Sequence, residues 1–200
     1  MKRFLIGVSA VLAWASCFAQ STAPAAPPAL VIKPLAERRI AELPTGPLYW
    51  RVENFASLDQ AQAAAGPTGL AVQAAGKVWL LTLGPKGGAT AGATVVAEVG
   101  PLPKVEASQY LLRINEASGP PGSVTPVHTH PGSETFYVLA GETSSRSPHG
   151  LLRVTAGSAE TGLGADVPMQ VSSSGKVDLH SLVMFVVDAN KPFSSPAKLP

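Results

Sequence analysis

Two histidines and one glutamate within seven residues carry the clearest chemical signal in this chain. His128 and His130 are separated by one residue, and Glu134 follows four positions later. On a strand, side chains two positions apart lie on the same face, so both imidazoles are expected to point to the same side. Pro131 and Gly132 favour a turn, and Glu134 begins an apolar run typical of the next strand. Two imidazoles and a carboxylate brought together from adjacent strands are suited to a divalent transition metal.

Two glycines bracket these residues. Gly122 precedes the first histidine and Gly141 follows the glutamate, at expected turns where glycine relieves backbone strain. The order glycine, five residues, His-x-His, three residues, glutamate, six residues and glycine resembles the first conserved motif of the cupin superfamily at every position. The resemblance is complete over residues 122–141 and looser over residues 109–188.

This resemblance implies an all-β fold, namely the cupin double-stranded β-helix or jelly-roll barrel. It also implies that His128, His130 and Glu134 are three of the four metal ligands usual in the family. The implied cofactor is one divalent transition metal, with Mn, Fe, Zn, Cu and Ni all open. A barrel that keeps the motif without holding a metal is the alternative.

The second motif of the family is where this sequence departs. Its core is a proline shortly before a histidine that serves as the fourth ligand, followed by an asparagine. One alignment of this motif, counted from Gly162, places Ser173 at the histidine position, and the other places Met169 there. Neither alignment supplies a histidine. The candidates for the fourth ligand are therefore water and four side chains: Met169, Gln170, Ser173 and His180.

The two remaining histidines have ordinary structural explanations. His149 lies between Pro148 and Gly150, a pattern typical of an exposed hairpin tip. His180 shares a strand face with Leu182 and Met184, so a core or edge position is favoured over ligation.

The first 19 residues predict a secretory signal peptide. Lys2 and Arg3 precede an apolar run, and Cys17-Phe18-Ala19 gives a small-residue exit before Gln20. The run is short of the roughly 20 apolar residues of a membrane-spanning helix. A lipid anchor at Cys17 is the second alternative. Soluble export to the periplasm or the exterior is the preferred interpretation.

Beyond the signal, the chain is expected to divide into four parts. Residues 20–47 are rich in Ala and Pro and predict an extended linker, with a short helical turn near 35–43 left open. Residues 48–104 predict an N-terminal β extension that packs on the barrel. Residues 105–191 predict the cupin domain, and residues 192–200 a C-terminal tail.

Short apolar runs separated by Gly or Pro supply the expected strands, in the pattern of a sandwich or barrel. Ser57 to Gln60 has the spacing of a helix capping box, and Gly66-Pro67 is a stop signal, so a short helix is expected between them. The expected strands are 48–55, 69–73, 77–83, 94–99, 109–115, 134–139, 151–155 and 177–188.

The net charge and the cysteine content argue against several classes of function. The chain has 15 Lys and Arg against 13 Asp and Glu, but Lys2 and Arg3 would leave with the signal, which gives 13 against 13. Binding to nucleic acid or to an anionic membrane therefore has no electrostatic basis. Cys17 is the only cysteine, so the mature chain has neither a disulfide nor thiolate chemistry.

Two classes of function remain. Two imidazoles and a carboxylate with open metal positions suit an oxygenase, isomerase or lyase acting on a small polar molecule. Glu142 and Arg153 are candidates for a second acid–base pair, although charged residues on hairpins are usually solvated. The alternative is a non-catalytic cupin that binds a ligand or serves a structural role. The expected partner is a small-molecule ligand or substrate, with a homodimer left open and no nucleic acid or membrane span.

Overall fold

The computed structural model describes residues 26–200, and the expected signal peptide lies outside them. The described chain is mostly antiparallel β structure with one short helix, α1 (Leu58–Ala64). The first half has six strands: β1 (Val31–Ile40), β2 (Tyr49–Phe55), β3 (Gly69–Ala74), β4 (Lys77–Gly84), β5 (Thr94–Val99) and β6 (Tyr110–Gly119). The second half has eight: β7 (His128–Thr129), β8 (Gly132–Ala140), β9 (Glu142–Ser147), β10 (Gly150–Thr155), β11 (Ala159–Thr161), β12 (Gln170–Ser173), β13 (Leu179–Asp188) and β14 (Ser195–Pro196).

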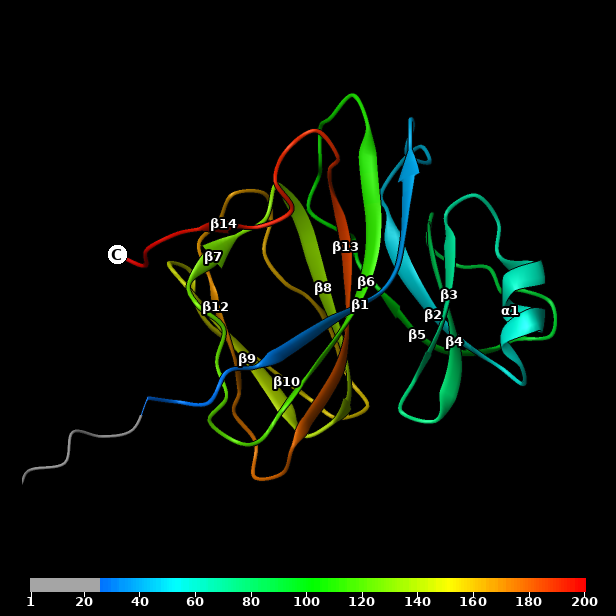
Figure 1. The fold of residues 1–200 in the computed structure, drawn as a ribbon. Helices are drawn as coiled ribbons and strands as arrows, with labels where there is room; N and C mark the ends of the chain where they lie inside the picture. Colours follow the sequence, from blue (N-terminus) through cyan, green and yellow to red (C-terminus); the bar gives the residue numbers. More distant parts are fainter. Residues whose placement is uncertain (1–25) are drawn as a thin grey trace, which may run out of the picture.

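A jelly-roll barrel forms the larger part of the molecule (Figure 1). One wall is a five-stranded sheet in the order β1-β6-β13-β8-β11, and the opposite wall combines β10-β9-β12 with the pair β14-β7. Apolar side chains from both walls meet inside, among them Phe136 on β8, Val183 on β13 and Val171 on β12. The all-β barrel expected from the sequence is confirmed.

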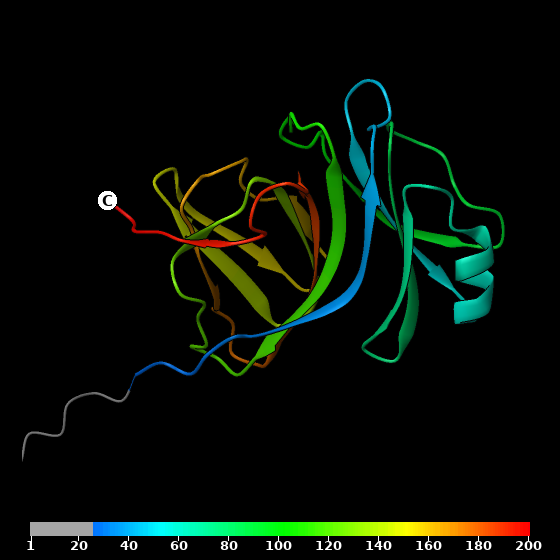
Figure 2. The ribbon, with the colours of Figure 1, turned by 45° about the horizontal axis from the view of Figure 1, so that its top comes forward.

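A second, four-stranded sheet packs against the outer face of the barrel wall (Figure 2). Its order is β3-β4-β2-β5. Trp79 on β4 and Tyr137 on β8 meet edge to face, with 5.6 Å between ring centroids. One buried cluster joins Trp50 and Leu81 of this sheet to Met184 of the barrel. The N-terminal strands and the barrel therefore share an apolar core.

The short helix α1 begins as its sequence predicts. The side chain of Ser57 accepts a hydrogen bond from the Gln60 amide at 3.3 Å, which satisfies a free donor of the first turn. Ala61 is fully buried against Val78 and Leu80 of β4. No helix in residues 26–200 is long and apolar enough to cross a membrane.

Part of the expected linker is instead a strand of the barrel wall. Residues 31–40 form β1, which pairs antiparallel with β6 along its whole length, so the interpretation of this stretch as a linker or helical turn is wrong. Prolines made the segment resemble a tether. Pro34 is accommodated because β1 is at the edge of the sheet and the register shifts between Pro34 and Ala36.

The C-terminal tail is also structured. After β13 the chain turns back, and β14 pairs with β7, so residues 195 and 196 lie opposite Thr129 and His128. The amide of Ala197 donates a hydrogen bond to the carbonyl of Val127 at 3.1 Å. A two-residue strand that contains a proline gives no strand signal in the sequence, which is why the tail was not expected to pair.

Candidate metal centre

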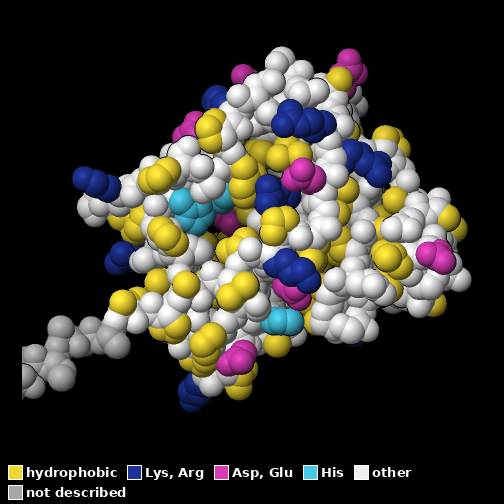
Figure 3. All heavy atoms as spheres, viewed as in Figure 1, with side chains coloured by type: hydrophobic (Ala, Val, Ile, Leu, Met, Phe, Trp, Pro, Cys, Tyr) yellow, Lys and Arg dark blue, Asp and Glu magenta, His cyan; other side chains and the backbone are white. Residues whose placement is uncertain are grey.

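A cavity of about 460 Å³ enters the barrel beside β7 and is lined by the three residues of the motif. Figure 3 shows a recess on this face, with histidine side chains among apolar ones. Sixteen residues line the cavity, and most are apolar. The only titratable side chains that line it in the described part of the chain are His128, His130 and Glu134.

His128 is held at the cavity by hydrogen bonds of its backbone and its ring. Its amide and carbonyl pair with the carbonyl and amide of Met169 at 2.9 and 2.8 Å. The ring Nδ1 is 2.8 Å from the carbonyl oxygen of Pro126. A carbonyl can only accept, so Nδ1 carries a proton, and in the neutral ring the lone pair is then on Nε2.

His130 is more deeply buried and is held in the same way. Its Nδ1–H donates to the carbonyl of Phe193 at 2.6 Å, and the ring packs against Phe185 and Phe193 at centroid distances of 4.8 and 4.7 Å. Burial lowers the pKa of His130 to about 4, with smaller contributions from His128 and Arg113. The imidazole is therefore neutral at physiological pH, as metal ligation requires.

Glu134 lies on β8 and faces the cavity, next to a close approach of two strands. A side chain at Gly132 would meet the Val186 carbonyl at 2.1 Å, so only glycine fits there. The Glu134 side chain is buried, and its Oε2 has no hydrogen-bond partner. Burial raises the pKa of its carboxyl to about 8. An unpaired buried carboxyl of this kind fits a site for a cation.

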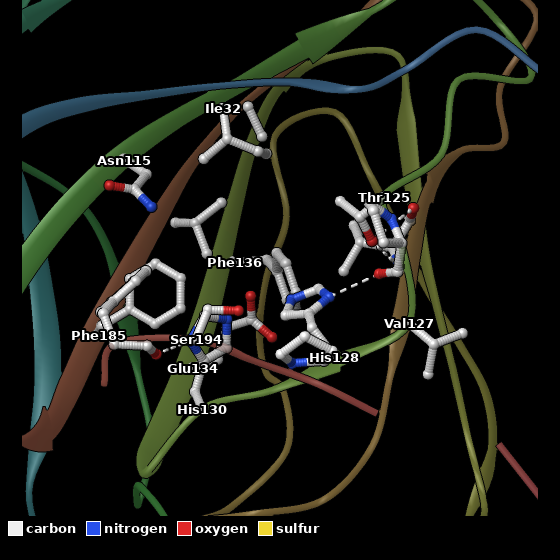
Figure 4. A pocket seen from close by; sticks show the side chains of 16 residues that line it. Ile32, Asn115, Thr125, Val127, His128, His130, Glu134, Phe136, Phe185 and Ser194 are labelled. Atoms are coloured by element: carbon white, nitrogen blue, oxygen red, sulfur yellow. Dashed lines mark hydrogen bonds between the residues drawn. The ribbon is translucent and has the colours of Figure 1, made fainter. Parts of the chain in front are cut away.

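The three side chains surround a common space without forming a finished coordination sphere. The rings of His128 and His130 are 4.9 Å apart between centroids and nearly perpendicular, at 84°. In the view of Figure 4 the Glu134 carboxyl lies between them. Within residues 26–200, no group of three or more His, Cys, Asp or Glu side chains is arranged to hold a metal ion. The residue types are nevertheless those that bind transition metals. The three side chains would have to move toward one another to coordinate an ion.

Two glycines of the motif lie where the sequence places them, at turns. Gly122 and Gly141 have φ of 85° and 72°, in the left-handed region that favours glycine. At Gly141 a side chain would also come within 2.7 Å of the Asp178 carbonyl. Gly141 thus allows the turn from β8 into β9 directly after the strand that carries Glu134.

None of the four side chains considered for a fourth ligand lines the cavity. Met169 is fully buried in the barrel core, and Gln170 donates to the carbonyl of Thr125 at 3.1 Å. Ser173 is buried on β12. His180 is half-buried near the start of β13, the central strand of the barrel wall, with Nδ1 3.8 Å from a Glu116 oxygen. Of the expected candidates for a fourth ligand, water is therefore the one that these positions leave in place.

The other polar residues singled out from the sequence lie away from the cavity. His149 is exposed in the turn between β9 and β10, as expected for a hairpin tip. Glu142 and Arg153 pair with each other at 2.8 Å on those strands, and Ser174 donates to the same Glu142 oxygen. They supply no second acid–base pair to the cavity.

Three polar groups that line the cavity have no signal in the sequence. Asn115 comes from β6, Thr125 from the segment before β7, and Ser194 from the C-terminal segment. The Phe193 carbonyl, which accepts the hydrogen bond from His130, could not be predicted either, because every residue has a backbone carbonyl. These groups come together only through the pairing of distant strands.

Comparison with known proteins gives structural matches alone: no family model and no curated protein matches this sequence. A cupin-like protein from Thermotoga maritima is 13% identical over 44% of this chain and 65% of its own length, with a TM-score of 0.39. The DMSP lyase DddQ from Ruegeria pomeroyi is 22% identical over 43% of each chain, with a TM-score of 0.37.

A cupin superfamily protein from Desulfitobacterium hafniense is 15% identical over 42% of this chain and 84% of its own, with a TM-score of 0.35. The chain spans less than two thirds of the lengths of the first two of these proteins. The fold assignment therefore rests on the strands and the motif of this chain. The antiparallel strands form the jelly-roll barrel that the resemblance to the cupin motif implies, and the three motif residues His128, His130 and Glu134 lie together at its cavity.

Proposed function

We propose that this chain is an exported cupin that binds one divalent transition metal at the cavity, through Nε2 of His128, Nε2 of His130 and the carboxylate of Glu134. The observation that carries the proposal is the buried, unpaired Oε2 of Glu134 in the same cavity as the two imidazoles. Both imidazoles use Nδ1 to bind a backbone carbonyl, which leaves Nε2 as the donor.

A cation would resolve the electrostatic conflict at Glu134. A buried carboxyl without a partner either keeps its proton or acquires a positive charge beside it. Among the described residues, 26–200, no Lys or Arg lines the cavity to provide that charge. Two imidazole nitrogens and one carboxylate favour a transition metal (Mn, Fe, Zn, Cu or Ni) over Mg or Ca. When bound, the metal would supply a Lewis acid or an O₂-activating centre.

The cavity supports a small-molecule ligand or substrate. Its volume of about 460 Å³ is within the usual range for small-molecule sites. Its walls are mainly apolar, with Phe136, Val183 and Phe185 among them. Besides the three motif residues, the polar side chains among the described residues that line it are Asn115, Thr125 and Ser194. A molecule with an apolar body and one polar group fits these walls better than the small polar molecule expected from the sequence.

The reaction proposed is that of an oxygenase, isomerase or lyase in which the bound metal supplies the reactive centre. The residues of this chain would bind the substrate, exclude water with apolar walls and hold the ligands. One observation favours the alternative of ligand binding without catalysis: within the part of the chain that the structure describes, the three donors are the only titratable side chains that line the cavity. Turnover would then depend on the metal alone for acid–base chemistry.

Metal titration of the purified protein tests the proposal. The protein is stripped with a chelator and titrated with Mn²⁺, Fe²⁺, Zn²⁺, Cu²⁺ and Ni²⁺, and bound metal is measured by elemental analysis. We expect one ion per chain, lost in His128→Ala and in Glu134→Ala. His149→Ala is the matched control, because that histidine is exposed far from the cavity, and it should bind like the wild type. Failure of all five metals to bind would contradict the proposal.

Export is the second part of the proposal, and it places the protein in the periplasm or outside the cell. It is supported by the charged start, the apolar run and the small-residue exit of residues 1–19. The intact mass of the exported protein should correspond to a chain beginning at or near Gln20. A mass that retains residues 1–19, or a diacyl addition at Cys17, would contradict it.

A further inference from the structure

The C-terminal segment crosses the face of the barrel beside the candidate metal site. The chain leaves β13 through a turn in which the Asn190 amide donates to the Asp188 side chain at 2.9 Å. It then runs back to β7, where β14 pairs with the strand that begins at His128 (Figure 1). Its residues Phe193, Ser194 and Pro196 line the cavity.

Phe193 links this segment to the site by its backbone and by its ring. Its carbonyl accepts the Nδ1–H of His130 at 2.6 Å, the shortest hydrogen bond described at either histidine. Its ring contacts the His130 ring at 4.7 Å and the Phe185 ring at 4.9 Å between centroids. Figure 4 shows this hydrogen bond drawn from His130.

The side chain of Arg113 on β6 also contacts the Phe193 ring. The Arg113 guanidinium carbon lies 4.3 Å from the centroid of the Phe193 ring, within the range of a cation–π interaction. Its Nε donates to Asn115 Oδ1 at 2.9 Å, and a terminal nitrogen lies 3.6 Å from a Glu37 oxygen. These contacts hold the guanidinium in place. The Phe193 ring therefore has two positioned neighbours, Arg113 and Phe185.

We infer that Phe193 is a positioning residue of the metal site: its ring anchors the C-terminal segment, and its carbonyl fixes the tautomer and orientation of His130. This inference rests on the proposed metal site. An imidazole whose Nδ1–H is held by a carbonyl presents the lone pair of Nε2 in one direction, and such partners tune metal affinity. Without the carbonyl, the His130 ring is free to rotate and to place its proton on Nε2.

The same segment also supports His128, but less directly. The pairing of β14 with β7 orders the backbone at His128, whereas its ring is held by the carbonyl of Pro126, two residues earlier in the segment before β7. Removal of the segment should therefore disturb the tautomer of His130 and leave that of His128 in place. This difference separates a positioning role from a general loss of structure.

Two truncations give a matched test. A chain that ends at Pro192 lacks the Phe193 carbonyl, its ring and β14. A chain that ends at Ala197 keeps all three, together with the Ala197–Val127 hydrogen bond. Full-length Phe193→Ala keeps the carbonyl but loses the ring anchor, and it serves if the shorter truncation does not fold. Circular dichroism and thermal unfolding verify that each variant is folded.

The readouts are long-range ¹H–¹⁵N spectra of the histidine rings in the metal-free protein and the affinity for Co²⁺ followed by its absorption. We expect the Nδ1–H tautomer for His130 in the wild type and in the chain ending at Ala197. In the chain ending at Pro192 the Nε2–H form should appear at His130, with His128 unchanged and Co²⁺ affinity lowered about 10- to 100-fold. Phe193→Ala should show the same changes to a smaller degree.

The two possible failures are distinguishable. An unchanged His130 tautomer and unchanged Co²⁺ affinity in the folded chain ending at Pro192 would overturn the role of Phe193 while leaving the metal site intact. If that chain does not fold, wild-type values for both readouts in Phe193→Ala would overturn it. A wild-type protein that takes up no Co²⁺ and none of the five metals above would overturn the metal site itself.

Discussion

Glu134 on β8 is the direct register partner of Phe185 on β13, so a carboxyl and an aromatic ring face the same cavity side by side. The pairing removes water from the carboxyl and gives it no compensating charge. Its pKa is raised to about 8 for this reason, whereas the unfolded chain would titrate it near 4.5. The consequences for stability and for metal binding are measurable.

Stability of the metal-free protein should fall between pH 6.5 and pH 8 because of Glu134. In that window the folded state retains a proton that the unfolded state has lost, so unfolding is favoured as pH rises. The slope is at most about 1.4 kcal/mol per pH unit, or roughly 2 kcal/mol over the window. Urea unfolding of Glu134→Gln should lack this contribution. Equal pH slopes in both proteins would contradict the raised pKa.

His130 should produce the opposite slope in acid. Burial lowers its pKa to about 4 from 6.5, so the unfolded state binds the extra proton between these values, and stability is lost as pH falls through that range. In Glu134→Gln the dependence of stability on pH that comes from His130 can be measured by itself, because the opposing contribution of the Glu134 carboxyl is removed. Urea unfolding of this variant at pH 4.5 and pH 6.5 measures it. Addition of His130→Gln should flatten the slope.

Metal affinity should rise with pH up to about 8, the pKa of the Glu134 carboxyl, since ligation requires the carboxylate. Below that pKa the apparent affinity should increase about tenfold per pH unit, with release of one proton from Glu134. Calorimetric titrations with Zn²⁺ at pH 7 in two buffers of different ionisation enthalpy count the protons. The same heat in both buffers would mean that the carboxyl is already ionised.

Substitution at the excluded ligand candidates should leave the metal bound. His180→Ala and Gln170→Ala are the sharpest cases, because neither side chain lines the cavity and both have other partners. One ion per chain is expected in each variant by elemental analysis, as in the wild type. Loss of the ion in His180→Ala would mean that β13 supplies a fourth ligand, and the open position would have to be abandoned.

The two sheets should unfold as a single unit, because one buried cluster joins them. Trp79 and Tyr137 contact each other across the boundary within this cluster. Trp79→Ala should destabilise the whole protein by about 3–5 kcal/mol. Calorimetry and fluorescence should report the same transition in the wild type and in the variant. Two well-separated transitions would show that residues 48–104 form an independent domain.

The sequence by itself predicted short strands of a sandwich or barrel and grouped the three motif residues, for local reasons, and the resemblance to the cupin motif favoured the barrel. Alternation along strands places His128 and His130 on one face, and Gly122 and Gly141 mark turns that need a positive φ. The apolar runs predicted most of the longer strands, and Ser57 predicted the start of the helix. Each of these features is encoded within a few neighbouring residues.

Only the tertiary structure decided what surrounds that centre, because those contacts join residues far apart in the chain. Strand β1 was hidden by Pro34, which an edge strand tolerates, and β14 was too short to leave a pattern. The Phe193 carbonyl accepts a hydrogen bond from His130, 63 positions earlier in the sequence, and no residue type predicts such a backbone acceptor. The raised pKa of Glu134 likewise comes from burial under strands that pair only in the folded barrel.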